Sequence, residues 1–358
     1  MGITGSPGGT PDTRGQASVA LPAILVLAGA ISVQSGAGIA TRLFTELPPA
    51  AVTALRLWTA ALIMLLLAGR PTVRALADLA RRRAWQDAAI AVGFGIVLGF
   101  MNFAIYQAFA RIPLGIAVTI EFLGPLTVTV AGTLRPADDR GQAAGGRRRA
   151  AGLGYAALAL AGVVLLGGAI GSAHLDLAGV AWAVGAGTAW AGYIIASKAT
   201  GQRFEGSAGL AIAMCVAAAA VTAPGVIAGA PKMFRPRFLA EGAGIGLLSS
   251  VIPYWLELEA LRRIRASLFG VWMSVQPAVA ALIGLVFLGQ RLSIAEWFGV
   301  CFVAVASAGA AYRAAVSAGE IPARSATRPA TDAPESATRP APPPPESRPS
   351  PAPPSAPR

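Results

Sequence analysis

Charge is scarce in this sequence. Asp, Glu, Lys and Arg make up 13% of its 358 residues, whereas hydrophobic residues make up 55%. A typical soluble domain has about 25% charged residues, so the composition excludes an ordinary soluble protein. The chain also has only two cysteines, Cys215 and Cys301, and one histidine, His174. These few residues argue against a disulfide framework, a zinc site or a histidine-based catalytic triad.

Enzyme signatures are absent as well. The sequence contains no Gly-x-Ser-x-Gly, His-Glu-x-x-His or P-loop motif, and the glycines of "GFGIVLG" (93–99) lie inside an apolar block. We therefore predict a protein that is not an enzyme and that uses no cofactor or metal. The net charge of +12 comes from Arg residues between apolar blocks. That placement favours orientation in a membrane over nucleic-acid binding.

Long apolar blocks are abundant. Each can cross a hydrocarbon core of about 30 Å as a helix, and the alternating pattern of a membrane β-barrel is missing. The N-terminus lacks the basic region and cleavage site of a signal peptide, so we expect the first block to be retained. The predicted spans are 20–41, 49–69, 87–110, 113–134, 151–171, 177–198, 208–229, 240–261, 266–289 and 293–312.

Basic residues assign an orientation to these spans. They are more frequent in the loops at 70–83, 135–149, 198–203 and 262–265 than in the alternate loops. The positive-inside rule then predicts a multi-pass protein of the cytoplasmic membrane with both termini in the cytoplasm. The loop at 231–237, which contains Lys232, Arg235 and Arg237, runs against this trend.

The two halves of the chain repeat one pattern. "YQAFARIPLGIAVTIEFLGPL" aligns without a gap with "LEALRRIRASLFGVWMSVQPA", so that Arg111 matches Arg263 and Pro125 matches Pro277. Spans 1–5 therefore match spans 6–10, and because five is odd the second copy enters the membrane inverted. The predicted fold is an all-α polytopic membrane protein with ten transmembrane helices in two inverted five-helix repeats. Such repeats build transporters with a site near the membrane midplane.

Composition sets the remaining boundaries. Residues 1–19 form a polar N-terminus, 20–171 and 172–312 are the two repeats, and 313–358 form a tail that becomes Pro-rich. The tail repeats "SATRPA" and has too few apolar residues to build a core, so we expect it to be disordered and cytoplasmic.

Several stretches resemble one family. "SVQSGAGIATRLF", "ARIPLGIAVTIEFLGPL", "PYWLELEALRRI" and "FGVWMSVQPAVAALIGLVFLGQRLS" resemble the EamA-type branch of the drug/metabolite transporter superfamily, and within it the bacterial threonine/homoserine exporters. This resemblance covers roughly residues 20–312. It implies export of amino acids or similar metabolites, commonly coupled to protons. Gln276 and Gln290 stand where the family pattern has acidic residues.

Glu121 is the leading site candidate, because it is the only charged residue in residues 112–134. An acid at that depth costs roughly 2.5–3.5 kcal/mol on insertion scales. It must face a cavity, pair with a base or hold its proton, so it is a candidate for substrate binding and proton coupling. A neutral acid hydrogen-bonded between helices is the alternative. Arg56 in span 2 lies at similar depth and could bind a substrate carboxylate, or it could snorkel to the interface.

Other polar groups complete the candidate set. In span 8, Glu257 follows Pro253 and lacks a local base, whereas Glu259 precedes Arg262 and Arg263 at the spacing of helix ion pairs. We assign Glu257 to the site and Glu259 to a structural pair. The further substrate-binding candidates are Gln34, Asn102, Tyr106, Tyr193 and Tyr254; packing between helices is the alternative for the aromatic residues.

The sequence therefore predicts a secondary transporter that exports small amino acids or related metabolites by proton-coupled alternating access. Two alternatives remain open: export of other drugs or metabolites on the same scaffold, and a membrane scaffold or sensor without transport. The expected partners are a small-molecule substrate and the lipid bilayer, with no nucleic acid. The protein is expected to be a monomer or a homodimer.

Overall fold

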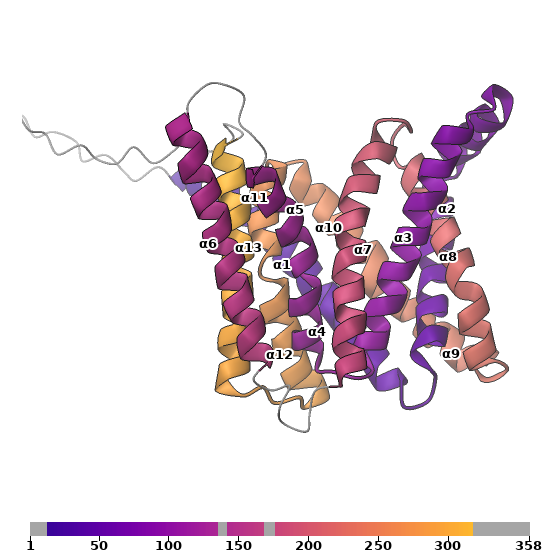
Figure 1. Ribbon diagram of the computed structural model, residues 1–358. Helices are drawn as coiled ribbons and strands as arrows, with labels where there is room; N and C mark the ends of the chain where they lie inside the picture. The colour runs from indigo at the N-terminus through magenta and orange to yellow at the C-terminus, as the bar shows by residue number, and fades with distance from the viewer. Residues whose placement is uncertain (1–12, 135–141, 168–175, 318–358) are drawn as a thin grey trace, which may run out of the picture. The chain divides into compact units, whose positions relative to one another are not determined.

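The computed structural model describes residues 13–134, 142–167 and 176–317 (Figure 1). This part of the chain is helical and contains no strand. The elements are α1 (Thr13–Leu43), α2 (Pro49–Arg82), α3 (Trp85–Phe109), α4 (Leu114–Glu121), α5 (Leu123–Leu134), α6 (Gln142–Gly167), α7 (Leu177–Gly201), α8 (Ala208–Gly229), η2 (Lys232–Phe234), α9 (Pro236–Gly246), η3 (Leu247–Val251), α10 (Ile252–Leu261), α11 (Ala266–Met273), α12 (Gln276–Leu288) and α13 (Ile294–Ser317).

Ten helical segments of the described chain are long and apolar enough to cross a membrane, which confirms the predicted fold class. Three of them are interrupted. Leu114–Leu134 consists of α4 and α5, Pro236–Leu261 consists of α9, η3 and α10, and Leu268–Leu288 lies in α11 and α12. Large side chains such as Leu66, Ile227 and Val286 are exposed, as expected for surfaces that face lipid.

Several predicted spans are too short: α1 begins at Thr13, α6 begins at Gln142 and α13 continues to Ser317. The largest difference is in span 2. Residues 70–82 form helix rather than a loop, because α2 continues to Arg82. The backbone of Ala68 departs from helical geometry, and Pro71 follows this kink. Proline is tolerated in the first turn of a helical segment, so the chain bends there and continues. The helix ends at Arg83, whose φ of 48° is left-handed. The basic residues of this region therefore lie on or just after a helix.

The two interruptions near Pro125 and Pro277 fall at matching positions. The helices α4 and α11 cover aligned residues of the two repeats. Leu114 at the start of α4 aligns with Ala266, and Glu121 at its end aligns with Met273. A proline cannot donate a hydrogen bond to the carbonyl four residues earlier. Pro125 therefore frees the carbonyl of Glu121, and Pro277 frees that of Met273. Shared chemistry thus explains the shared breaks.

The helix contacts also follow the repeat. When each span is exchanged for its counterpart in the other half, the pair α3–α7 becomes α1–α10, α3–α8 becomes α2–α9, and α4–α7 becomes α1–α12; all of these pairs are in contact. The halves interleave, and their described helices belong to one compact unit. This arrangement is consistent with two related halves, while the inversion and the predicted domain limits stay predictions. The predicted N-terminal residues 1–12, His174 and the chain beyond Ser317 lie outside the described residues.

Candidate functional site

Glu121 lies at the break between α4 and α5. Glu121 is 9% exposed, and its carboxyl group makes no hydrogen bond or ion pair within the described chain. The backbone here is pressed against α7: a Cβ added to Gly124 would lie 2.0 Å from the carbonyl oxygen of Gly187. Glycine is therefore required for this close approach. The break places the Glu121 carboxyl group in the interior of the helical bundle without a hydrogen-bond partner in the described chain.

Arg56 lies on α2, half-buried, and faces the second half of the protein. Its Nη2 donates to the backbone oxygen of Ser249 at 3.1 Å, and its guanidinium carbon lies 5.3 Å from the centroid of the Tyr106 ring. It also acts electrostatically on Glu121, although no ion pair joins the two among residues 13–134 and 176–317. The structure thus brings the two leading candidates into one electrostatic neighbourhood.

A π-helical turn in span 8 supplies the acceptors for this neighbourhood. In η3 the N–H of Ile252 donates to Leu247, one residue further back than in an α-helix, so the carbonyl of Leu248 is freed. Pro253 has no N–H and frees the carbonyl of Ser249. The Ser32 hydroxyl donates to Leu248 at 2.7 Å and Arg56 donates to Ser249. Such turns occur frequently at functional sites.

Tyr193, Tyr254 and Glu257 form a second polar group next to the first. The hydroxyls of Tyr193 and Tyr254 interact with one another, and Glu257 acts electrostatically on both hydroxyls. Arg56 acts on Tyr254 as well, which connects this group to Glu121. A Cβ on Gly29 would lie 3.8 Å from Cγ of Glu257, so α1 forms the neighbouring surface. Five of the predicted residues are therefore linked.

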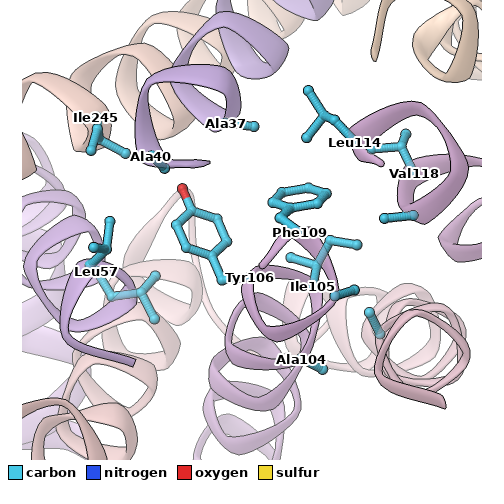
Figure 2. Packing of buried hydrophobic residues seen from close by; sticks show 14 of the residues in the cluster. Ala37, Ala40, Leu57, Ala104, Ile105, Tyr106, Phe109, Leu114, Val118 and Ile245 are labelled. Carbon is cyan, nitrogen blue, oxygen red and sulfur yellow. The ribbon is translucent and has the colours of Figure 1, made fainter. Parts of the chain in front are cut away.

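Tyr106 is joined to this set through Arg56. It is 1% exposed and packs against Phe44 and Phe109, with ring centroids at 5.9 and 5.7 Å. Figure 2 shows its hydroxyl pointing towards Ala40 of α1, with Leu57 to one side. The ring contributes to the hydrophobic core while the hydroxyl remains available.

Gln34 and Asn102 are used differently from the linked residues. Gln34 donates from Nε2 to Oε1 of Gln276 at 3.1 Å, which joins α1 to the start of α12. Asn102 donates to the carbonyl of Leu98 on its own helix at 2.9 Å. No contact in the described chain connects either residue to Glu121, and both stay predictions as site residues.

The predicted structural ion pair of span 8 is confirmed. Glu259 contacts Arg262 at 3.3 Å and Arg263 at 2.5 Å. The indole of Trp190 packs edge-on against Phe122, the residue at the break in span 4, with centroids 4.9 Å apart. These contacts place Glu259 in a surface pair and make Trp190 part of the support behind Glu121.

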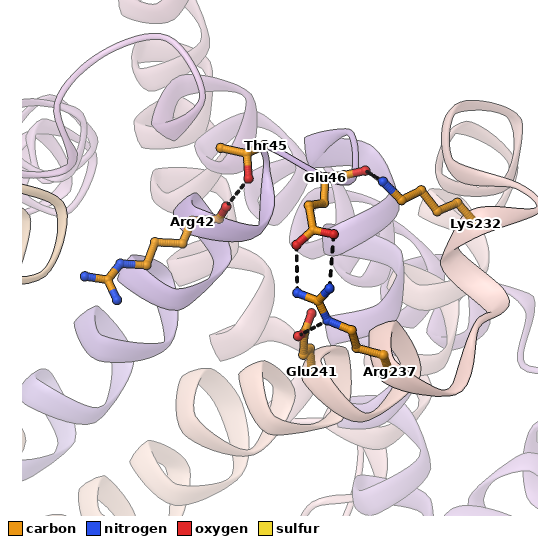
Figure 3. A network of polar contacts seen from close by, with 6 residues as sticks. All are labelled: Arg42, Thr45, Glu46, Lys232, Arg237 and Glu241. Atoms are coloured by element: carbon orange, nitrogen blue, oxygen red, sulfur yellow. Dashed lines mark hydrogen bonds and ion pairs between the residues drawn. The ribbon is translucent and has the colours of Figure 1, made fainter.

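One end of the bundle carries a polar network between the α1–α2 loop and α9 (Figure 3). Arg237 donates to both carboxylate oxygens of Glu46, at 2.7 and 3.2 Å, and to Glu241 at 2.9 Å. Lys232 donates to the carbonyl of Glu46 at 2.8 Å. Two basic residues that run against the charge rule thus have partners at this end.

Ser249 and Gln276 are polar residues at these breaks that the sequence analysis did not assign to the site. The partners of both lie in the first half of the chain, on α2 and α1. One signal was available: Ser249 stands four residues before Pro253, the spacing at which proline frees a carbonyl. No group of three or more His, Cys, Asp or Glu in the described residues could hold a metal ion.

These features define a class of protein: a multi-pass membrane transporter, with interrupted helices around buried charges. Comparison with known proteins specifies the family. The EamA-like transporter family matches residues 177–312. The threonine/homoserine exporter RhtA of Salmonella typhimurium LT2 and that of Escherichia coli K12 are each 32% identical over 300 residues, which cover 84% of this chain and 94% of each exporter. The chain belongs to the EamA-like transporter family.

Two further likenesses are weaker. An uncharacterized transporter of Bacillus subtilis, YwfM, is 32% identical over 146 residues, covering 41% of this chain and 49% of that protein. A crystal structure of a protein with 20% sequence identity matches with a TM-score of 0.50 and covers 82% of this chain and 98% of that one. The second likeness concerns the fold alone.

Proposed function

We propose that this protein exports threonine, homoserine or similar small amino acids across the cytoplasmic membrane, in exchange for protons. Its assignment as a membrane transporter follows from the family. The amino-acid substrate is suggested by the relatives, which are threonine/homoserine exporters. This chain matches 94% of the length of each of them. Proton exchange is supported by the position of Glu121.

The observation that carries the proposal is that Arg56 and Glu121 both lie in the interior and act on one another electrostatically. Each charge alone would be expensive in an apolar bundle. Together they offset one another, and they match the two charges of a zwitterion: a guanidinium fork for the carboxylate and a carboxylate for the ammonium group. The Glu121 carboxyl group has no hydrogen-bond or ion-pair partner within the described chain, so it is free to bind an amine.

A cycle follows from this arrangement. Ionised Glu121 binds the substrate ammonium when the site is open to the cytoplasm. Once the site opens to the outside, a proton binds to Glu121, the attraction is lost and the amino acid leaves. The proton then passes to the cytoplasm when the site reopens there. One proton enters for each amino acid exported.

Alternating access would use the three interrupted helices. A broken helix can change its angle at the break without rupture of regular hydrogen bonds, and non-helical backbone in a membrane is tolerated where it lies inside protein. The breaks at Phe122 and Ser274 and the π-helical turn at Leu247–Val251 are the points of articulation. The cytoplasmic position of both termini belongs to this proposal.

The test is transport by the purified full-length protein in liposomes. With L-threonine or L-homoserine inside and a more acidic medium outside, we expect efflux that slows when the proton gradient is collapsed. Efflux that ignores the gradient would contradict proton exchange. If neither amino acid moves, metabolite profiling of medium from cells with and without the gene separates another exported substrate from a sensor that transports nothing.

A further inference from the structure

Arg56 and two residues in contact with it each have a buried side-chain donor without a partner among the described residues. Nε of Arg56, the hydroxyl of Tyr106 and the hydroxyl of Ser249 have no hydrogen-bond partner within the described chain. Tyr106 is 1% and Ser249 6% exposed. Arg56 lies over the ring of Tyr106 and donates from Nη2 to the backbone of Ser249. Groups from α2, α3 and η3 are therefore held together by a single residue.

Two features of the backbone determine the position of the Ser249 side chain. The π-helical turn changes the direction of side chains in the middle of span 8. α1 must also come very close, since a Cβ on Gly36 would lie 2.2 Å from Oγ of Ser249. Any larger residue at position 36 would displace this hydroxyl. Close packing without a hydrogen bond for Oγ is unexpected if Ser249 serves only to join the helices.

A buried donor without an acceptor destabilises a folded protein, and native proteins leave few of them. Three such donors in one place indicate a ligand that accepts hydrogen bonds. The guanidinium makes that ligand an anion. Glu121 and Glu257 act on the same neighbourhood, so a singly charged group is favoured over a phosphate. A carboxylate has two oxygens that can accept about four hydrogen bonds and fits the Arg fork.

We propose that Arg56, Tyr106 and Ser249 form the binding site for the substrate carboxylate, and that the two hydroxyls select for that group. Arg56 supplies charge and Nε–H, and the two hydroxyls orient the carboxylate oxygens. This three-donor site rests on the proposed function, because it assumes that the substrate is an amino acid. The three-donor site adds the requirement that the substrate has a free carboxylate. Ser249, in the second half of the chain, contributes to this requirement.

The experiment measures ligand binding to the purified full-length protein in lipid nanodiscs. L-Threonine is compared with threoninol, which has a hydroxymethyl group in place of the carboxylate, and with 3-hydroxybutyrate, which lacks only the amine. The variants are Ser249→Ala and Tyr106→Phe, each of which removes only a hydroxyl. Ser250→Ala is the matched control, since Ser250 is a neighbouring buried serine in the same turn.

We expect Ser249→Ala and Tyr106→Phe each to weaken threonine binding by about tenfold, the effect of one hydrogen bond to a charged group. Threoninol binding should change by less than about twofold, and Ser250→Ala should change neither. Equal losses for threonine and threoninol, or an unchanged affinity in both hydroxyl variants, would overturn the three-donor site while leaving amino-acid transport intact.

The opposite result is distinguishable. If the wild-type protein binds 3-hydroxybutyrate but not threonine, and Ser249→Ala weakens that binding, the carboxylate site stands and the amino-acid function fails. If the wild-type protein binds none of the three ligands, both proposals fail. Size-exclusion profiles and thermal unfolding of each variant establish that the loss is not one of folding.

Discussion

Two ion pairs occupy corresponding positions at opposite ends of the bundle. Glu46 follows span 1 and contacts Arg237 in the first turn of span 8; Arg203 follows span 6 and contacts Asp87 in the first turn of span 3. Helix α2 lies between Glu46 and Asp87, and its 34 residues extend about 51 Å. Each end of the protein is therefore closed by the same type of contact, with the acid and the base exchanged.

The two ends differ in how firmly they are joined. Arg237 binds both oxygens of Glu46 and is also bound by Glu241, and Lys232 adds a bond to the same loop. Arg203 meets Asp87 through one ion-pair contact at 3.1 Å. A cation at a helix N-terminus is unfavourable and an anion favourable, which explains why Arg237 needs two carboxylates. We infer that the Glu46 end opens less readily.

The largest effect is expected from the group that both ends enclose. Glu121→Gln keeps the shape and hydrogen bonding of the side chain but cannot ionise. The variant should insert and fold normally, because a costly acid has been removed from the membrane. Export by the variant should be reduced at least about tenfold. Acidification of the outside should speed export by the wild-type protein but should not change export by the variant. Met273→Gln, at the matching break, is the control.

Wild-type export rates and a wild-type pH response in a well-expressed Glu121→Gln protein would contradict the proton-coupling role. The acid would then be a structural group, and the comparison of the two ends would no longer describe access to a coupling site. A loss of export in Met273→Gln as severe as in Glu121→Gln would show instead that any substitution at a break disables the protein.

The next effect is expected at the Glu46 end. Glu46→Gln removes one charge from the network and should allow this end to open. The reporter is Ala40→Cys in a background without Cys215 and Cys301, because Ala40 is fully buried on α1 close to this end. Labelling by a thiol reagent should rise several-fold, since a small bias moves the populations of two nearly balanced states.

Alternating access makes a second demand on this variant. When the Glu46 end opens more often, the Asp87 end should open less, so labelling of Ala91→Cys, another fully buried position, should fall. Simultaneous increases at both reporters would indicate a loosened fold rather than a shift between two states.

Asp87→Asn is the matched change at the other end, and its effect should be smaller. It removes the ion pair with Arg203 and an anion from the first turn of α3, where that anion is favourable. Labelling of Ala91→Cys should increase by about twofold, in keeping with the low value of exposed ion pairs. An increase larger than that of Ala40→Cys in Glu46→Gln would reverse the ranking of the two ends.

The sequence was sufficient for the spans, and the reason is local, whereas the roles of the site residues stay predictions. Apolar length predicts a membrane helix from a window of about twenty residues. Polar groups in apolar spans usually have a function. This rule selects Arg56, Glu121, Tyr193, Tyr254 and Glu257. The structure links these five.

What the sequence could not provide depends on contacts between distant segments. The use of Ser249 is decided by Arg56, which is 193 residues away, and that of Gln34 by Gln276. Hydropathy does not predict the extension of α2 beyond residue 69. The last turns of this helix are rich in charged residues, as loops are. The charges of the 231–237 loop opposed the orientation rule because Glu46 and Glu241 pair with Arg237.

The smallest effect is expected from the Pro-rich tail. Deletion of residues 319–358 removes chain that follows α13, and it tests whether anything beyond the described helices contributes to the difference between the two ends. The segment is poor in apolar residues and rich in proline, so it cannot add to the core. Export and thermal stability should stay close to wild-type values, and labelling of both reporters should be unchanged. A truncated protein that cannot be extracted from the membrane in active form, or in which the labelling of Ala91→Cys alone rises, would show that the tail helps to hold one end closed.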